Sequence, residues 1–301
     1  MTKYFEIDSI IIIQSLEDYE NKTGNYFKEE FEYLVNENNL KIEVTILNCE
    51  NFKEFRSIIN GIINDDSINY PWIHIDCHGS IDNGLEFSNG SEIGWGELRK
   101  ILIPLNIKAK FNLPLSLSTC YGANFLGEIG SDKMEPSPCR LLMGPTTEVS
   151  PADLMRNFRS FYRNLFYGFN LKNAVEVIEK SEDGDFWLIE LAERWFVLTM
   201  LDYIRTHCND DALNVRARRI YKKLKKFGAK HKSISSIVRE MKRDALMNYI
   251  PFVFSQYFAI EYLPENKEKF SWVLQEFYEG VKRLKDRKII SFCLNSYKSN
   301  I

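Results

Sequence analysis

The chain has 301 residues, which is enough for one large domain or two modest ones with a substantial buried core. Hydrophobic residues make up 45% of the sequence and charged residues 27%, values that are ordinary for a globular protein in water. The formal net charge of −3 gives no electrostatic basis for binding nucleic acid, which usually requires a strongly basic surface.

Short β-branched runs alternate with helical patterns over the first 180 residues. Strands are expected at residues 10–14, 41–47, 72–75, 113–117 and 140–144, and helices at 27–35, 52–63, 95–103, 152–167 and 171–179. The third of these helices is expected to end at Pro104. Strands that alternate with helices predict βαβ units and a mostly parallel sheet flanked by helices, which is the α/β fold class.

Strand signals almost vanish after residue 181. Helical patterns follow one another at residues 187–204, 212–227, 233–249, 251–262 and 270–285. The polar sequence SEDG at 181–184 is expected to separate two domains. We therefore predict an α/β domain at residues 1–180 and an all-helical C-terminal domain at residues 181–301.

Neither apolar run resembles a targeting signal or a membrane span. Glu6 and Asp8 precede the first, at residues 10–13, and three charged residues interrupt the second, at residues 186–200. The six cysteines show no CxxC pair, which favours buried thiols in a reducing compartment over a disulfide framework. We expect a cytoplasmic protein without membrane contact.

Two of the expected strands end in residues that carry chemistry. Residues 72–79 read WIHIDCHG and place His78 and Gly79 at one strand end, and residues 115–122 read LSLSTCYG and place Cys120 at another. Loops at the carboxyl ends of parallel strands are where ligands and catalytic groups collect. An imidazole is a suitable base for a thiol because it titrates near neutral pH. The pattern predicts a nucleophile, Cys120, with His78 as its general base.

The motifs resemble those of the caspase-like cysteine peptidases, and more closely those of their bacterial CHAT branch. The resemblance runs in motif order over about residues 70–180 and includes the H-x-x-x-H-G strand, the segment LEF at 85–87 and the cysteine strand. It implies peptide hydrolysis through a thioester on Cys120, an oxyanion hole formed by the amides of Gly79 and Cys120, and no cofactor. It also implies a protein substrate, cut in a peptide loop, and a role as an effector in bacterial antiphage or stress responses.

Specificity does not follow from the resemblance. Metacaspase-like members carry an acidic residue two positions before the cysteine, where this chain has Ser118, and caspases read Gln-Ala-Cys there. Asp82 and Glu86, just after His78, are candidates together with Ser118 for lining a substrate pocket. The polar segment at residues 130–138 is either a surface loop or a gate beside the substrate groove.

Three other interpretations stand beside this one. The chain could be a catalytically inactive caspase-like scaffold that binds partners, in which case Cys120 is a core thiol. A zinc site could use a subset of His74, His78 and the nearby Asp and Cys residues, although alternate strand residues face opposite ways. A nucleotide-binding α/β protein ranks lowest because no glycine-rich phosphate loop follows the first strand.

Two further features have structural explanations as well as functional ones. His74 is expected to pack or to hydrogen-bond inside the sheet, and Cys77 to be buried on the face opposite Asp76. A basic stretch in the helical region is a solvated helix face or, alternatively, a site for an upstream activator or signalling ligand. That stretch comprises Arg216, Arg218, Arg219, Lys222, Lys223, Lys225 and Lys226.

Overall fold

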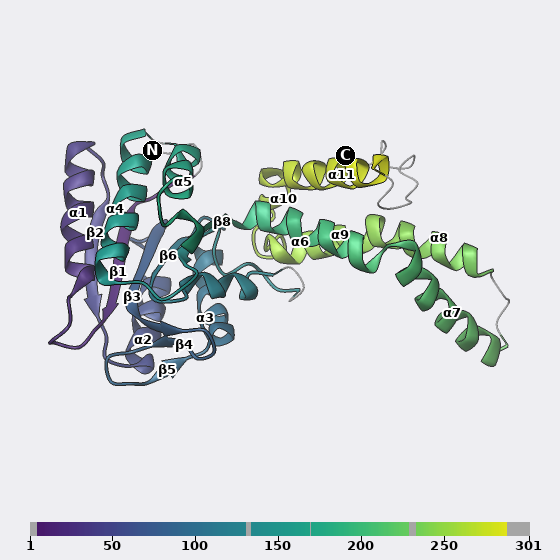
Figure 1. Cartoon of the computed structure of the whole chain (residues 1–301), viewed down its shortest axis with the longest axis horizontal. Coiled ribbons are helices and arrows are strands. Elements are labelled where there is room, and N and C mark those ends of the chain that lie inside the picture. The colour runs from purple at the N-terminus through teal and green to yellow at the C-terminus, as the bar shows by residue number, and fades with distance from the viewer. Residues whose placement is uncertain (1–4, 131–133, 169, 229–232, 288–301) are drawn as a thin grey trace. The chain divides into compact units, whose positions relative to one another are not determined.

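The computed structural model describes residues 5–130, 134–168, 170–228 and 233–287 (Figure 1). The chain forms two compact units. The first comprises residues up to 130 together with Ser137–Ala192, and the second comprises the chain from Glu193 together with the described residues 134–136.

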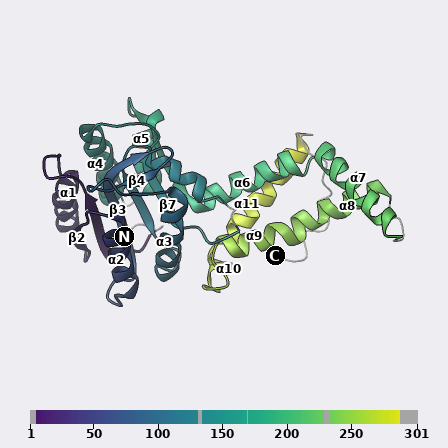
Figure 2. The same ribbon diagram turned by 90° about the horizontal axis from the view of Figure 1, so that it is seen from below.

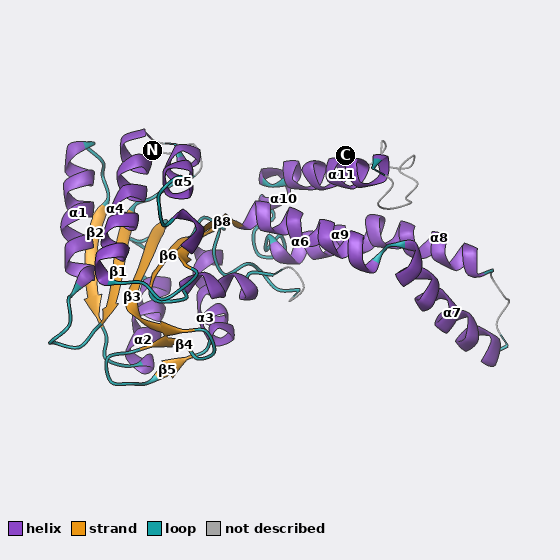
Figure 3. Ribbon diagram, in the orientation of Figure 1, coloured by secondary structure: helices purple, strands orange, loops and turns teal. Residues whose placement is uncertain are grey.

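A mixed sheet forms the centre of the first unit. Its main strands are β1 (Ser9–Ser15), β2 (Glu43–Asn48), β3 (Pro71–Ser80), β6 (Pro114–Ser118), β7 (Leu141–Pro145) and β8 (Trp187–Leu191). They lie in the order β2-β1-β3-β6-β7-β8, and every neighbouring pair is parallel except β7 with β8 (Figure 3). The predicted α/β class with a mostly parallel sheet is confirmed.

Five helices cover the two faces of this sheet. They are α1 (Thr23–Glu37), α2 (Phe52–Asn64), α3 (Trp95–Lys108), α4 (Pro151–Gly168) and α5 (Leu171–Glu179). Helices α1, α4 and α5 lie on one face, and α2 and α3 lie together on the other, as the two views agree (Figures 1 and 2). The connection after β1 therefore runs to one face, whereas those after β2 and β3 run to the other.

Aromatic side chains fill the core between the sheet and α1, α4 and α5. Phe27 and Phe31 of α1 contact Phe158 and Tyr162 of α4, and Trp72 of β3 packs edge-on against Tyr162 with ring centroids 5.5 Å apart. All of these rings are fully buried. Burying large apolar side chains is the main favourable term in folding, so this layer fixes the α1 and α4 side of the sheet.

Two expectations for the elements were wrong. Helix α3 continues through Pro104, although proline removes one helical hydrogen bond. Beyond the proline, Leu105 is fully buried, and the buried Asn106 donates to the Ser137 carbonyl and accepts from the Leu113 N–H. These contacts offset the lost bond and continue the helix to Lys108.

The expected helix at residues 187–204 begins as a strand. Residues 187–191 form β8, which pairs antiparallel with β7, and its first residue, Trp187, packs edge-on against Phe158. Pairing with β7 supplies the backbone hydrogen bonds that a helix would otherwise supply. The first unit consequently ends at Ala192, whereas the sequence placed the domain boundary at residues 180 and 181.

The second unit is helical over its described residues. It contains α6 (Ala192–His207), α7 (Asp210–Lys226), α8 (Ile234–Asp244), the π-helical turn at Ala245–Tyr249, α9 (Ile250–Tyr257), α10 (Asn266–Lys269) and α11 (Ser271–Asp286). Its core is again aromatic, with Phe196 packed against Phe254, Tyr257 and Phe258. Within the described part of the chain, no helix is both long and apolar enough to span a bilayer.

Candidate functional site

The strand ends that carry His78 and Cys120 are neighbours in the sheet. β3 and β6 pair in parallel, and the last paired residues are Asp76 and Ser118. Two residues further along each chain come His78 and Cys120, so both follow neighbouring strand ends at the carboxyl edge of the sheet. The spacing of 42 residues between them equals the offset of the strand pairing.

Gly79 allows the two strand ends to approach each other closely, and Gly122 allows the chain after Cys120 to turn back against β6. A Cβ on Gly79 would lie 2.6 Å from the carbonyl oxygen of Cys120, and one on Gly122 would lie 2.8 Å from the Cβ of Leu117. Real Cβ atoms do not tolerate such distances, so glycine is required at both positions. Between them, Tyr121 has φ of 59°, in the left-handed region, where the chain turns after Cys120. The sequence thus folds into a tight turn that presents the cysteine.

The residues two positions before His78 and Cys120 are Asp76 and Ser118. Both are polar and lie on the face of the sheet that α1 and α4 cover. On that face Ser118 Oγ donates to Asp76 Oδ1 at 3.0 Å, and His74 Nδ1 lies 2.8 Å from Tyr162 Oη. Side chains two apart on a strand share a face, so His78 lies on the face of His74 and Asp76. The contacts at the tips agree with this, because His78 binds the loop before α1 and Cys120 approaches the loop before α4.

His78 is held by a carboxylate from the loop between β1 and α1. Its Nε2 lies 2.7 Å from Glu20 Oε1, and the imidazole side chain is 51% exposed. Partial burial alone would raise the pKa of Glu20, but hydrogen bonds from the Glu17 N–H and from His78 outweigh it and lower the pKa below its usual range. Glu20 is therefore a carboxylate at neutral pH, and it fixes the orientation of the ring.

Cys120 differs in exposure from the other cysteines. Of the five that the structure describes, Cys120 alone is half-buried, and the remaining four are buried. Burial raises the pKa of Cys49 to about 11 and that of Cys77 well above its ordinary value, so these thiols stay protonated. The Sγ of Cys120 lies 3.8 Å from the carbonyl oxygen of Val149. Cys120 is the accessible thiol of the described chain.

Asp76 forms the floor beneath the two strand tips. It is 1% exposed and accepts hydrogen bonds from Thr23 Oγ1 at 2.7 Å and from Ser118. Burial raises the pKa of Asp76 to about 6, against the opposing effect of the hydrogen bonds from Thr23, Ser118 and the Gly24 N–H. The carboxyl group ties the start of α1 to β3 and β6.

The expectations for His74 and Cys77 are confirmed. His74 is fully buried among Phe27, Phe158 and Tyr162, and burial lowers its pKa to about 3, so the ring is neutral at physiological pH. Cys77 is 5% exposed, next to Asp76 in a strand whose successive side chains alternate between faces.

The three candidates for a substrate pocket lie in different environments. Ser118 is 1% exposed and engaged with Asp76. Asp82 is exposed in the turn between β3 and β4 (Gly84–Glu86), which continues to β5 (Glu92–Ile93). Glu86 is exposed on β4 and pairs directly with His78 in antiparallel register. Glu86 is thus the candidate that lies beside the histidine, and a role for any of the three stays a prediction.

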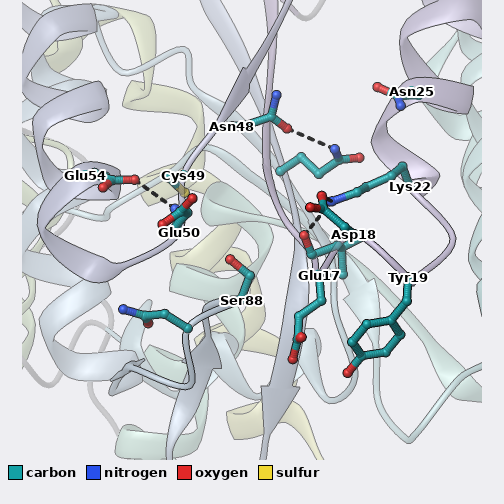
Figure 4. A pocket seen from close by; sticks show the side chains of 13 residues that line it. Glu17, Asp18, Tyr19, Lys22, Asn25, Asn48, Cys49, Glu50, Glu54 and Ser88 are labelled. Carbon is teal, nitrogen blue, oxygen red and sulfur yellow. Dashed lines mark hydrogen bonds and ion pairs between the residues drawn. The ribbon is translucent and has the colours of Figure 1, made fainter.

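A pocket of about 700 Å³ lies at the carboxyl ends of β1 and β2 (Figure 4). Residues from the loop after β1, the loop after β2 and the segment after β4 line it. They are Gln14, Leu16, Glu17, Asp18, Tyr19, Lys22, Asn25, Asn48, Cys49, Glu50, Glu54, Ser88 and Asn89. The sequence offered no expectation for this pocket.

Two alternatives from the sequence, a zinc site and a ligand site at the basic stretch, gain no support from the described residues. Among the residues that the structure describes, no three His, Cys, Asp or Glu side chains gather as metal ligands would. Most of the basic residues at 216–226 are exposed on α7, and the Arg216 guanidinium donates to the His207 carbonyl oxygen. A signalling ligand there stays a prediction.

Of the proposed gate at residues 130–138, residues 131–133 lie outside the described chain.

Sequence reasoning missed Glu20, because it considered only the ends of β3 and β6. The rule that points to those strand ends applies equally to β1, whose carboxyl end carries the acidic residues Glu17, Asp18 and Glu20. No protein-family model matches the chain, and no curated protein is significantly similar to it in sequence.

Proposed function

We propose that the protein is a cysteine endopeptidase of the caspase-like type, most similar to the CHAT branch, with Cys120 as nucleophile and His78 as general base. The observation that carries the proposal is the parallel pairing of β3 with β6 up to Asp76 and Ser118, two residues before His78 and Cys120, which supports their meeting at one edge of the sheet. The half-buried state of Cys120 supports it as well, because a nucleophile must be reachable.

Glu20 supplies the third part of a catalytic arrangement. When one ring nitrogen of a histidine donates to a carboxylate, the other nitrogen is free to act as a base. Nε2 of His78 is the nitrogen that binds Glu20. We propose that Glu20 fixes the tautomer in which Nδ1 carries the lone pair that receives the thiol proton.

The reaction is acyl transfer from an amide to the thiol. The Cys120 Sγ attacks the carbonyl carbon of the scissile peptide bond, and His78 takes the thiol proton. The C–N bond then breaks, the leaving amine takes that proton from His78, and a thioester remains on Cys120. Water, deprotonated by His78, attacks the thioester, the C–S bond breaks, His78 returns the proton to the Cys120 sulfur, and the carboxylic acid is released. The amides of Gly79 and Cys120 stabilise the oxyanion in both steps.

The substrate is a specific loop of another protein. The wider role that we propose, an effector in antiphage defence or a stress response that an upstream signal activates through the helical unit, rests on the resemblance alone. The alternative, an inactive scaffold of the same fold, makes the opposite prediction about hydrolysis.

A library of decapeptides followed by mass spectrometry tests the proposal. The full chain is expected to cut peptides, Cys120→Ala to lose all cutting, and Cys208→Ala to retain it, since Cys208 is a buried thiol of the other unit. Circular dichroism verifies that the variants fold. Cutting that survives in Cys120→Ala contradicts the assignment, and a chain that cuts no peptide under any activating condition favours the scaffold.

A further inference from the structure

Hydrogen bonds to the Asp76 carboxylate connect the start of α1 to β3 inside the protein. Thr23 Oγ1 donates to it, at 2.7 Å from Oδ1 and 2.8 Å from Oδ2, and both side chains are buried. The N–H of Gly24 donates to the same carboxylate. Because the pKa of Asp76 is about 6, the group is mostly ionised at pH 7, and hydrogen bonds to an ionised acceptor are stronger than neutral ones.

Helix α1 receives its N-terminal cap from this carboxylate. Among the described residues, Lys22 at the N-cap position makes no side-chain capping bond, and the first turn of α1 holds no acidic side chain. The first N–H groups of a helix lack partners within the helix and favour a nearby negative charge. Asp76, 53 residues away along the chain, takes the place of the missing local cap and holds the first turn where it is.

The same two segments are joined a second time by Glu20 and His78. Asp76 lies two residues before His78 on β3, and Thr23 lies three residues after Glu20 in the loop that leads to α1. Both side-chain bonds are 2.7 Å long, and together they close a short ring that runs through residues 20–23 and 76–78. A ring this short leaves little conformational freedom, so making one bond keeps the partners of the other close together.

The other end of the loop is fixed by the same row of side chains. Asn48, Gln14, Asp76 and Ser118 are register partners on β2, β1, β3 and β6. Gln14 Nε2 donates to Asn48 Oδ1 at 2.9 Å, and Ser118 Oγ donates to Asp76 Oδ1 at 3.0 Å. The loop that carries Glu20 therefore runs between two buried anchors, one near the end of β1 and one at the start of α1.

The orientation of His78 depends on where this loop holds Glu20. The carboxylate follows the backbone of the loop, since its Oε2 accepts from the Glu17 N–H at 2.6 Å while its Oε1 binds His78. The His78 side chain is half exposed, and an ion pair in contact with water is too weak to fix a ring by itself. The bond between Thr23 and Asp76 is buried, so water does not compete with it. The buried bond supplies the rigidity that the exposed pair lacks.

We propose that Asp76 and Thr23 are positioning residues for the reaction: their buried bond holds Glu20 against His78 and thereby keeps Nδ1 of the imidazole as the nitrogen that receives the thiol proton. The inference rests on the proposed peptidase function and adds the means by which the fold orients the base. Both residues act through Glu20 and not on the reacting atoms.

Two substitutions at one position test the proposal. Thr23→Val removes the hydroxyl and keeps the shape of the side chain, whereas Thr23→Ser keeps the hydroxyl. With the best library peptide, Thr23→Val is expected to lower kcat about tenfold and to leave KM nearly unchanged, because a misplaced base slows the chemical step without weakening substrate binding. Thr23→Ser should keep kcat within about twofold of wild type.

Circular dichroism verifies folding, and Thr23→Ala is the second variant if Thr23→Val does not fold. A kcat of Thr23→Val equal to that of wild type overturns the inference and leaves the peptidase standing. An equal loss of kcat in Thr23→Ser overturns it as well, because the hydroxyl would then not be the group that matters.

A measurement on the imidazole itself needs no substrate. Long-range proton–nitrogen correlation spectra at about pH 8.5, where histidine is neutral, report which ring nitrogen carries the proton. The His78 signal, identified by its absence in His78→Ala, should show the Nε2–H tautomer in wild type and Thr23→Ser and a mixture of tautomers in Thr23→Val. His74, which is held by Tyr162, serves as the internal reference.

The spectra separate this inference from the peptidase. If the wild-type chain cuts no peptide, a mixed His78 tautomer in Thr23→Val keeps the positioning pair and discards the peptidase. A His78 tautomer that is the same in Thr23→Val and wild type overturns the inference, whether or not hydrolysis changes.

Discussion

The interior and the tip of one strand pair carry the same residue types in opposite states. In the interior, His74 is fully buried and neutral. Cys77, one residue before His78 and on the opposite face of β3, is a protonated buried thiol. At the tip, His78 is half exposed and bound to a carboxylate, and Cys120 is half-buried. Four residues along β3 separate a packing histidine from a candidate base. Position along the strand, and not residue type, decides which of them can perform chemistry.

Replacing each of the two histidines separately gives the largest expected difference in peptide hydrolysis. His78→Ala removes the proposed base, so peptide hydrolysis at pH 7 is expected to fall about a thousandfold. His74→Gln is expected to keep hydrolysis within about tenfold of wild type, because His74 contacts no part of the proposed chemistry. Turnover of the best library peptide measures both. A larger loss of turnover in His74→Gln than in His78→Ala reverses the assignment.

The buried histidine makes the folded state sensitive to acid. The pKa of His74 is lowered to about 3 in the folded chain, so below pH 6.5 the unfolded chain binds a proton that the folded chain does not. Stability from this group is complete above pH 6.5 and declines as the pH falls, by about 3 kcal/mol between pH 6.5 and pH 4. Urea unfolding of His74→Gln at the two pH values should lack this loss. An unchanged pH dependence contradicts a neutral buried ring.

Asp76 acts in the opposite direction. Its pKa is raised to about 6, so the folded chain holds the proton more tightly than the unfolded chain does. The associated stability is present below pH 4 and is lost as the pH rises through 6, by about 2 kcal/mol between pH 4 and pH 7. Asp76→Asn, which keeps an acceptor for Thr23 and Ser118, should remove that loss from the urea unfolding curves. A variant whose stability changes with pH over this range as that of wild type does disproves the raised pKa.

The ion pair between His78 and Glu20 should contribute least to the stability of the fold. The His78 side chain is 51% exposed, and ion pairs in contact with water contribute less than about 1 kcal/mol. Glu20→Gln is therefore expected to change the unfolding free energy by no more than that, while it alters the pH profile of hydrolysis, because the carboxylate that orients the His78 ring is gone. The lowered pKa of Glu20 means that its contribution is present at neutral pH and lost in acid. An unaltered pH profile would show that Glu20 does not position the base.

The sequence predicts those parts of the fold that local patterns determine. Most strands and helices of the first unit agree with their periodicity to within a few residues, and the two strand ends with His78 and Cys120 follow from the parallel register. The last turn of helix α3 and strand β8 were missed because tertiary contacts, the burial of Leu105 and the pairing with β7, outweigh the local signals of Pro104 and of the apolar run after Phe186.

The partners of the site residues were less accessible to sequence reasoning. Glu20 lies 58 residues from His78 along the chain, and Thr23 lies 53 residues from Asp76. Only the order of strands in the sheet brings these residues together. Strand order is a property of the whole topology, and no local pattern in one sequence specifies it.

The rate at which a small electrophile alkylates Cys120 tests most directly whether the two strand tips act as one unit. Iodoacetamide at pH 7, with the modified cysteine identified by mass spectrometry, reports thiolate formation without requiring a substrate. Wild type and His74→Gln should react at Cys120 at similar rates, and His78→Ala roughly tenfold or more slowly, because it lacks the proposed base. Equal rates in wild type and His78→Ala would show that the imidazole and the sulfur do not communicate.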